Sequence, residues 1–214
     1  MKIELTKGQR VWFTSDSHYN HGNICKATSN WEDLSSTRDF DSLEEMNRLI
    51  VDNINSKVKE DDYLFHLGDF AFGGINAVKE FREKINCKNI HLILGNHDWR
   101  IIENINIVKP WFSSISEYKS LTVFTPGEET DLKHRFILFH YPIASWNGMC
   151  GGVMQIHGHV HLHKEQRING VKAIDIGVDA NDFMPLCLEE IVELLKDQEE
   201  CKTLILPKKN KQST

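Results

Sequence analysis

Long hydrophobic runs are missing from this sequence of 214 residues. No apolar stretch approaches the roughly 20 residues that a membrane-spanning helix requires. The segment from Met1 to Lys7 also lacks the apolar core of a secretory signal peptide. We therefore expect no membrane partner and a cytoplasmic location.

Paired cysteines and an excess of basic charge are missing as well. The five cysteines are odd in number and show no C-x-x-C spacing, which argues against a disulfide framework or a zinc ribbon and is typical of a reduced intracellular protein. The 25 Lys and Arg residues are outnumbered by 31 Asp and Glu residues, which gives a formal net charge of -6. This charge argues against an extended nucleic-acid-binding surface. The sequence has no long apolar heptad repeat, so it does not indicate the oligomeric state.

The composition is even along the chain, and no Pro/Gly/Ser-rich linker divides it. Short apolar runs alternate with amphipathic segments, which predicts a single α/β domain over residues 1–207 and a disordered basic tail over 208–214. Strands are expected over residues 11–15, 63–67, 90–94, 121–124, 135–139, 153–156 and 171–176, with an edge strand at 203–206. Helices are expected over 42–58, 75–85 and 185–195, the first opened by a capping box of Ser42 and Glu45, and residues 101–112 are expected to form a short helix and a turn around Pro110.

Polar side chains follow directly after five of the strand-like runs. They are Asp16 and His18, then Asp69, then Asn96, His97 and Asp98, then His140, and finally His159 and His161. The D-x-H spacing would put Asp16 and His18 on one side of an extended backbone, and Gly95 would allow the sharp turn before Asn96. Because ligands bind at the carboxyl ends of strands in open α/β sheets, we expect these side chains to gather at one site.

The chemistry of these side chains favours a metal centre. Carboxylate and amide oxygens combined with imidazole nitrogens suit Mn, Fe, Zn or Co, whereas thiolates are absent from the set. The candidate ligands number seven: Asp16, His18, Asp69, Asn96, His140, His159 and His161. Seven side chains are too many for one ion and fit two ions that share a bridging carboxylate. Two such ions, ~3.5–4 Å apart, can activate a water and neutralise the oxygens of a phosphoryl group.

The blocks D-x-H, G-D, G-N-H-D, H and G-H-x-H, in this order from Asp16 to His161, resemble the calcineurin-like metallophosphoesterase superfamily. The flanking residues 16–24 and 176–179 resemble its small bacterial and phage members. The resemblance implies a four-layer α-β-β-α sandwich with two central mixed β-sheets. It also implies a dinuclear metal-dependent phosphoric ester hydrolase, with manganese as the first choice of metal and Fe, Zn, Co or Ni as alternatives.

The resemblance further implies a role for each matching residue. One ion would be held by Asp16, His18 and His161, the other by Asn96, His140 and His159, with Asp69 bridging them. His97 would contact a phosphate oxygen and protonate the leaving group, and Asp98 would orient its imidazole by a hydrogen bond. A metal-bridging hydroxide would be the nucleophile. A purely structural Asn-His-Asp turn is the alternative for His97.

Several other polar residues have two possible interpretations. His21 is either a substrate contact or a solvated loop residue, and Arg38 and Arg100 either contact phosphate through a bidentate fork or are surface charges. Asp179 braces either a ligand or a loop. We expect His157 to lie behind the ligands or in the core.

The expected function is hydrolysis of a small phosphomonoester or phosphodiester, with a nucleotide among the candidate substrates. One alternative is a metal-dependent nuclease, which the net charge disfavours. The other is a non-catalytic interaction module, which the complete ligand set disfavours. Loops 19–41 and the glycine-rich loop after Pro142 are expected to set the substrate preference.

Overall fold

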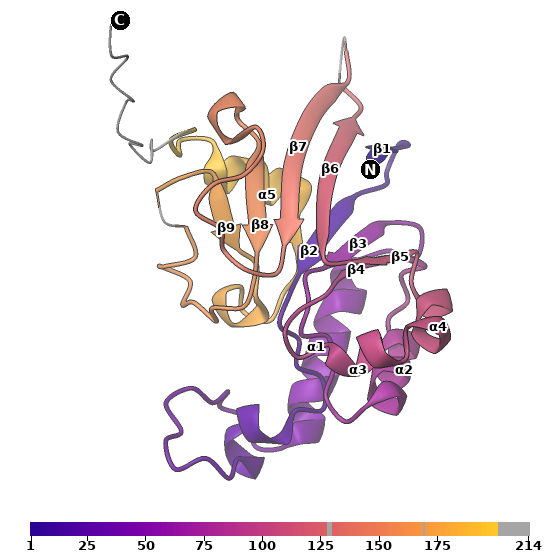
Figure 1. Cartoon of the computed structure of the whole chain (residues 1–214), viewed down its shortest axis with the longest axis vertical. Helices are drawn as coiled ribbons and strands as arrows, with labels where there is room; N and C mark the ends of the chain where they lie inside the picture. Colours follow the sequence, from indigo (N-terminus) through magenta and orange to yellow (C-terminus); the bar gives the residue numbers. More distant parts are fainter. Residues whose placement is uncertain (128–129, 169, 201–214) are drawn as a thin grey trace, which may run out of the picture.

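The computed structural model describes residues 1–127, 130–168 and 170–200 and contains two five-stranded mixed sheets. The first sheet has the order β10-β2-β3-β4-β5 and the second the order β1-β6-β7-β8-β9. Figure 1 shows the two sheets side by side, with helices α1 to α4 gathered against the first. The prediction of a mixed α/β fold is therefore confirmed.

The first sheet is formed by four parallel strands and one antiparallel edge strand. The parallel strands are β2 (Val11–Thr14), β3 (Tyr63–His66), β4 (Asn89–Ile93) and β5 (Ser114–Ser116), and β10 (Leu186–Cys187) pairs antiparallel with β2. The interior strands are buried along almost their whole length, as expected for a parallel sheet that is covered on both faces.

The second sheet is built around a long hairpin. Its strands are β1 (Lys2–Glu4), β6 (Tyr118–Thr125), β7 (Leu132–Phe139), β8 (Met154–His157) and β9 (Ala173–Asp175). Strands β6 and β7 pair antiparallel, whereas β1 joins β6, and β8 joins β7 and β9, in parallel. Only Glu117 separates β5 in the first sheet from β6 in the second, so the chain passes between the sheets at that point.

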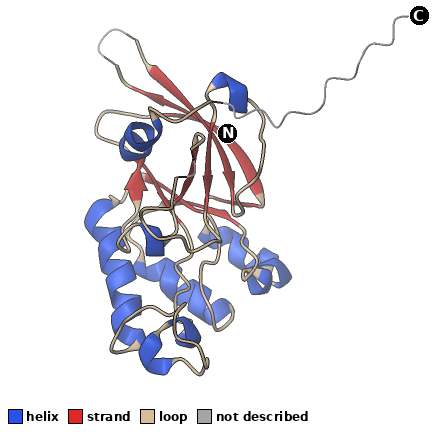
Figure 2. Cartoon of the chain, turned by 90° about the vertical axis from the view of Figure 1, so that its left-hand side faces the viewer, coloured by secondary structure: helices blue, strands red, loops and turns tan. Residues whose placement is uncertain are grey.

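The helices are α1 (Leu43–Lys57), α2 (Ile75–Lys84), α3 (Trp99–Glu103), α4 (Ile105–Val108) and α5 (Leu188–Leu195), and Figure 2 shows most of the helical residues at one end of the molecule. Ser42 caps α1 by accepting a hydrogen bond from the Glu45 N–H (3.0 Å), which confirms half of the predicted capping box. The Glu45 carboxylate accepts from the Asp41 N–H (3.1 Å) instead of from Ser42. Met46, Ile50 and Ile54 line one face of α1 and are buried against the first sheet. Among the described residues, no helix is both long enough and apolar enough to cross a membrane.

One hydrophobic core lies between the first sheet and helices α1 and α2, and a second core fills the space between the two sheets. Phe13 of the first sheet lies 5.6 Å, centroid to centroid, from both Phe65 and Phe136, the latter in the second sheet. Helix α5 adds Leu188 and Ile191 to the same core and contacts strands of both sheets. Because α5 touches both sheets, the four-layer order of the sandwich stays a prediction.

Some predicted boundaries are wrong. The last helix begins at Leu188 rather than Pro185, because Leu186 and Cys187 pair with strand β2. Strands β1 and β5 were not predicted, since each has only three residues and owes its conformation to its neighbour in the sheet. The predicted strand at 203–206 and the tail at 208–214 lie outside the described residues.

Candidate metal centre

The candidate ligands come together where strands β2, β3, β4, β7 and β8 end. Backbone hydrogen bonds join these strand ends: the Asp16 N–H donates to the Gly68 carbonyl (3.0 Å), and the Gly158 N–H donates to the His140 carbonyl (2.9 Å). The His159 N–H donates to the Asp16 carboxylate at 3.0 Å. The predicted gathering of strand-end residues therefore occurs, and it draws on both sheets.

Glycines make this close approach possible. Gly68 has a φ of 99°, and a Cβ at this position would lie 2.5 Å from the Gly95 nitrogen. A Cβ at Gly158 would collide with the carboxylate of Asp16. The strand ends are thus close enough that side chains at these positions would displace the candidate ligands.

The backbone at the ligands is strained. Five of the seven candidates adopt left-handed φ values: Asp16 (55°), His18 (47°), Asp69 (53°), His159 (74°) and His161 (48°). Such values are uncommon for residues other than glycine and cluster at functional sites. The prediction that Asp16 and His18 follow an extended backbone is wrong, because the strand ends at Thr14 and two left-handed residues then turn the side chains inward.

Asp16, His18 and His161 form one group of candidate ligands. The Nε2 atoms of His18 and His161 lie 3.1 Å apart, and the His161 Nε2 is 3.8 Å from Asp16 Oδ1. Atoms bound to one ion at 2.0–2.3 Å lie roughly 3–4 Å from one another. One atom from each of these residues lies within 4.8 Å of the others, so the three could hold one cation.

Asn96, His140 and His159 form the neighbouring group. The Asn96 Oδ1 lies 2.9 Å from both the His140 Nε2 and the His159 Nδ1. Asp69 lies between the two groups, because its Oδ2 is 3.6 Å from the His18 Nε2 and 3.6 Å from the His140 Nε2. The seven candidate residues therefore lie close together, with Asp69 near both groups, and Asp16 also lies within reach of Asp69 and His140. Their division between two ions stays a prediction.

The electrostatics of these residues fit a cation. Burial raises the pKa of Asp16 to about 7 and lowers the pKa of His18 well below its usual value. Both shifts arise because solvent is excluded from charged groups. A bound cation would replace the lost solvation of the carboxylate and would coordinate a neutral imidazole, so the donor set suits divalent ions.

Arg38 holds the first group from behind. Its side chain is 5 % exposed, and its guanidinium donates to both carboxylate oxygens of Asp179 (2.8 and 2.9 Å) and to the carbonyls of Asp16 (2.6 Å) and Ser17 (2.9 Å). Asp179 in turn lies 2.7 Å from the Nδ1 of His161. Although burial opposes it, the charge of Arg38 holds the pKa of Asp179 below its usual range. Arg38 is thus buried rather than a surface charge, its donors are engaged by protein acceptors, and Asp179 braces the candidate ligand His161.

Asp98 has a different role from the predicted one. Its carboxylate is buried and accepts hydrogen bonds from the backbone N–H groups of Asp69 (2.9 Å), Phe70 (3.0 Å) and Gly95 (2.8 Å). Because both oxygens are engaged by the backbone, Asp98 joins the turns after β3 and β4 instead of orienting the His97 imidazole. Burial raises its pKa to about 7.

His97 and His21 border the centre. The His97 N–H donates to Asp69 Oδ1 (2.9 Å), while its exposed imidazole lies 5.5 Å, centroid to centroid, from His18. His21 accepts a hydrogen bond from the Ile24 N–H at Nδ1 (3.0 Å) and lies 5.5 Å from the His18 ring. His21 therefore caps a loop turn at the edge of the site, and its contact with substrate stays a prediction.

Two further histidines are buried behind the ligands. His157 is buried at the end of β8, with its Nδ1 3.1 Å from the Gly158 carbonyl, as expected for a residue behind the ligands. His66 is buried as well and contacts the hydroxyl of Ser17 (2.7 Å), a link to the D-x-H turn that the sequence did not reveal.

The chain is similar to known proteins over most of its length. An uncharacterized protein of Methanocaldococcus jannaschii is 29% identical over 202 residues, which make up 92% of this chain and 97% of that protein. The crystal structure of a protein of unknown function from Aquifex aeolicus has a TM-score of 0.60 and 25% identity, over 88% of this chain and 100% of the other. The family model of calcineurin-like phosphoesterases matches residues 9–207. This chain therefore belongs to the calcineurin-like phosphoesterase family, which implies metal-dependent hydrolysis of phosphoesters.

Proposed function

We propose that this protein hydrolyses a small phosphomonoester or phosphodiester at a centre of two divalent ions. Asp16, His18 and His161 hold one ion. Asn96, His140 and His159 hold the other, with Asp69 between them. Manganese is the proposed metal, because the set mixes hard oxygens with imidazoles and contains no thiolate.

The position of Asp69 carries this proposal. Its Oδ2 is equally distant, at 3.6 Å, from one imidazole of each group. A carboxylate so placed suits a pair of ions rather than a single one. When bound, the ions would supply positive charge that lowers the pKa of a water and neutralises phosphate oxygens.

His97 is the proposed proton donor. Its backbone is fixed by the bond to Asp69, and its exposed ring faces the centre from the side of His18 and Phe72. An imidazole in this position can contact a phosphate oxygen and protonate the departing ester oxygen. The ring is held by packing against Phe72 (5.1 Å between centroids), since Asp98 is engaged elsewhere.

The test is hydrolysis of a chromogenic monoester and its matching diester after metal stripping and reloading with Mn²⁺. Asp69→Asn should lose metal and activity together, whereas His97→Gln should keep its metal and lose activity by roughly 10²–10⁴-fold. His134→Gln is the matched control, because His134 lies on β7 beside Thr125 and outside the ligand set.

Three outcomes would contradict the proposal. A wild-type protein that binds no metal would refute the ligand assignment and favour the interaction module. Metal binding without turnover of either ester would refute the small-substrate assignment. Faster cleavage of DNA than of the small diester would favour the nuclease.

A further inference from the structure

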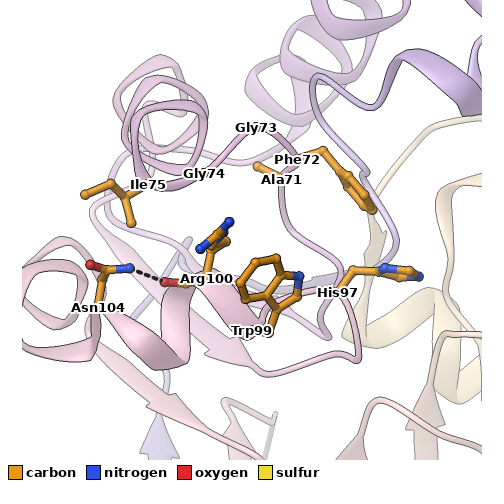
Figure 3. Close-up of a pocket in the computed structure, with 9 residues that line it drawn as sticks. All are labelled: Ala71, Phe72, Gly73, Gly74, Ile75, His97, Trp99, Arg100 and Asn104. Atoms are coloured by element: carbon orange, nitrogen blue, oxygen red, sulfur yellow. Dashed lines mark hydrogen bonds between the residues drawn. The ribbon is translucent and has the colours of Figure 1, made fainter.

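A cavity of about 510 Å³ adjoins the proposed centre on the far side of His97. Figure 3 shows Trp99 and Arg100 in the middle of its lining, with Ile75 and Asn104 at one end and Phe72 and His97 at the other, where the His97 imidazole points away from Trp99. Its volume lies within the 300–1,000 Å³ typical of small-molecule sites. None of the seven candidate metal ligands lines it.

His97 separates this cavity from a second one. The second cavity, about 450 Å³, is lined by His18, His161 and Asp179 and so lies on the metal side. His97 lines both. A phosphoryl group must contact the metal side, and the ester oxygen that receives the proton must lie next to His97. The cavity beyond His97 is therefore where the leaving group would extend.

Trp99 gives this cavity an aromatic surface. It directly follows the G-N-H-D turn, at the start of α3, and is 47 % exposed. An exposed indole beside a cavity offers a stacking face for a planar group, and such stacking accepts any nucleobase.

Arg100 adds a positive charge next to that surface. Its guanidinium carbon lies 3.7 Å from the centroid of the Trp99 ring, which holds the cation against the indole. Its Nη1 donates to Glu103 (3.1 Å), and among the described residues its Nε and Nη2 have no hydrogen-bond partner. Two parallel donors of this kind can bind a phosphate bidentately.

We propose that this cavity binds a leaving group that is a nucleoside phosphate, with its base stacked on the face of the Trp99 indole that Arg100 does not cover and its own phosphate paired with Arg100. The inference rests on the proposed function and narrows the substrate to a short phosphodiester whose departing part is a nucleotide. Water attacks phosphorus and the bond from phosphorus to the departing oxygen breaks. The electron pair of that bond stays on the departing oxygen, which takes a proton from His97.

The experiment measures binding separately from hydrolysis. Full-length, metal-loaded protein is titrated calorimetrically with adenosine and with the 5′-phosphonate analogue of AMP, in which a P–C bond replaces the ester bond. Turnover of a chromogenic diester is measured in parallel. Trp99→Leu and Arg100→Gln are the test variants, and both positions are exposed, so the fold is preserved. Tyr118→Leu, at an aromatic residue on β6 that is 46 % exposed and lines neither cavity, and Arg48→Gln on α1 are the matched controls. Trp31→Leu, whose indole lines the second cavity, tests the rival stacking position.

Trp99→Leu should lower the affinity for adenosine and for the phosphonate by at least about fivefold, because stacking on the indole is lost. Arg100→Gln should weaken the phosphonate by about tenfold and leave adenosine unchanged. The two controls should match the wild type.

Unchanged binding in Trp99→Leu, or a loss that appears only in Trp31→Leu, would overturn the assignment of this cavity. Absence of adenosine binding together with normal diester turnover would refute this inference and leave the proposed function standing. Binding of adenosine without turnover of the diester would refute the proposed function and leave this cavity as a nucleoside site.

Discussion

Replacing Arg38 tests whether the residues behind the first ligand group determine metal binding. Arg38→Gln removes the buried cation that bonds to Asp179 and to the carbonyls of Asp16 and Ser17. Breaking a buried ion pair by removing one partner costs about 3–5 kcal/mol, because the other charge stays buried. Asp179 is 20 % exposed at its side chain, so we expect the lower end, about 3 kcal/mol.

The expected loss can be measured in two ways. At roughly 2–4 °C per kcal/mol for a protein of this size, the melting temperature should fall by roughly 6–12 °C. Metal affinity should fall about 10- to 100-fold, because His161 loses a fixed Asp179 behind its Nδ1. Arg38→Lys keeps the positive charge but lacks the planar guanidinium, so it should recover only part of the melting temperature and part of the metal affinity.

The control is Arg48→Gln on the exposed face of α1, which should change the free energy of unfolding by no more than about 0.5 kcal/mol. If Arg38→Gln binds Mn²⁺ as tightly as the wild type, measured by calorimetry, Arg38 does not position the ligands. If it also melts at the wild-type temperature, the buried ion pair contributes nothing and the reasoning is refuted.

Three other predictions follow from the same structure. Gly158→Ala should lower metal content, measured by elemental analysis, because the new Cβ would collide with Asp16; Gly151→Ala, whose nearest neighbour would be 3.6 Å away, should not. Burial lowers the pKa of His91 to about 4, so the contribution of His91 to the free energy of unfolding should be intact above pH 6.5 and fall by up to about 3 kcal/mol as the pH drops to 4. Over that range the melting temperature of His91→Phe should fall less than that of the wild type, while His66 and the other buried histidines still titrate. Saturating Mn²⁺ at about 100 times its Kd should stabilise the stripped protein by about 2.7 kcal/mol, and an equal gain in Asp69→Asn would contradict the bridging position.

The sequence predicted where the candidate ligands lie better than it predicted their local conformation. Each ligand follows an apolar strand, and strand ends converge in any sheet of this kind, so position along the chain was enough to locate Asp69 and His140. The left-handed backbone of Asp16 and His18 has no such signal, because it depends on contacts with residues about 50 and 140 positions away, such as Gly68 and His159.

Partners distant in the sequence explain the remaining differences. Asp98 was assigned to its neighbour His97, whereas its carboxylate reaches the backbone of a different strand end, 29 residues earlier. Arg38 meets Asp179 across 141 residues, and no local pattern marks either as part of one cluster. Sequence spacing can identify the chemistry of a site, but hydrogen bonds between distant segments decide which residues support it.

The passage of the chain between the sheets also orders the steps by which the centre is assembled during synthesis. Residues 11–116 contain the four parallel strands of the first sheet and carry Asp16, His18, Asp69 and Asn96. His140, His159 and His161 reach the ribosome exit only after β6 has followed, and β1 waits for the same strand to find its partner. A nascent chain stopped at Glu117 should therefore hold an ion weakly, since every imidazole but His18 is still missing from the ligand set. Tight metal binding would then require a complete second sheet, so the ion would bind late in the folding of the chain.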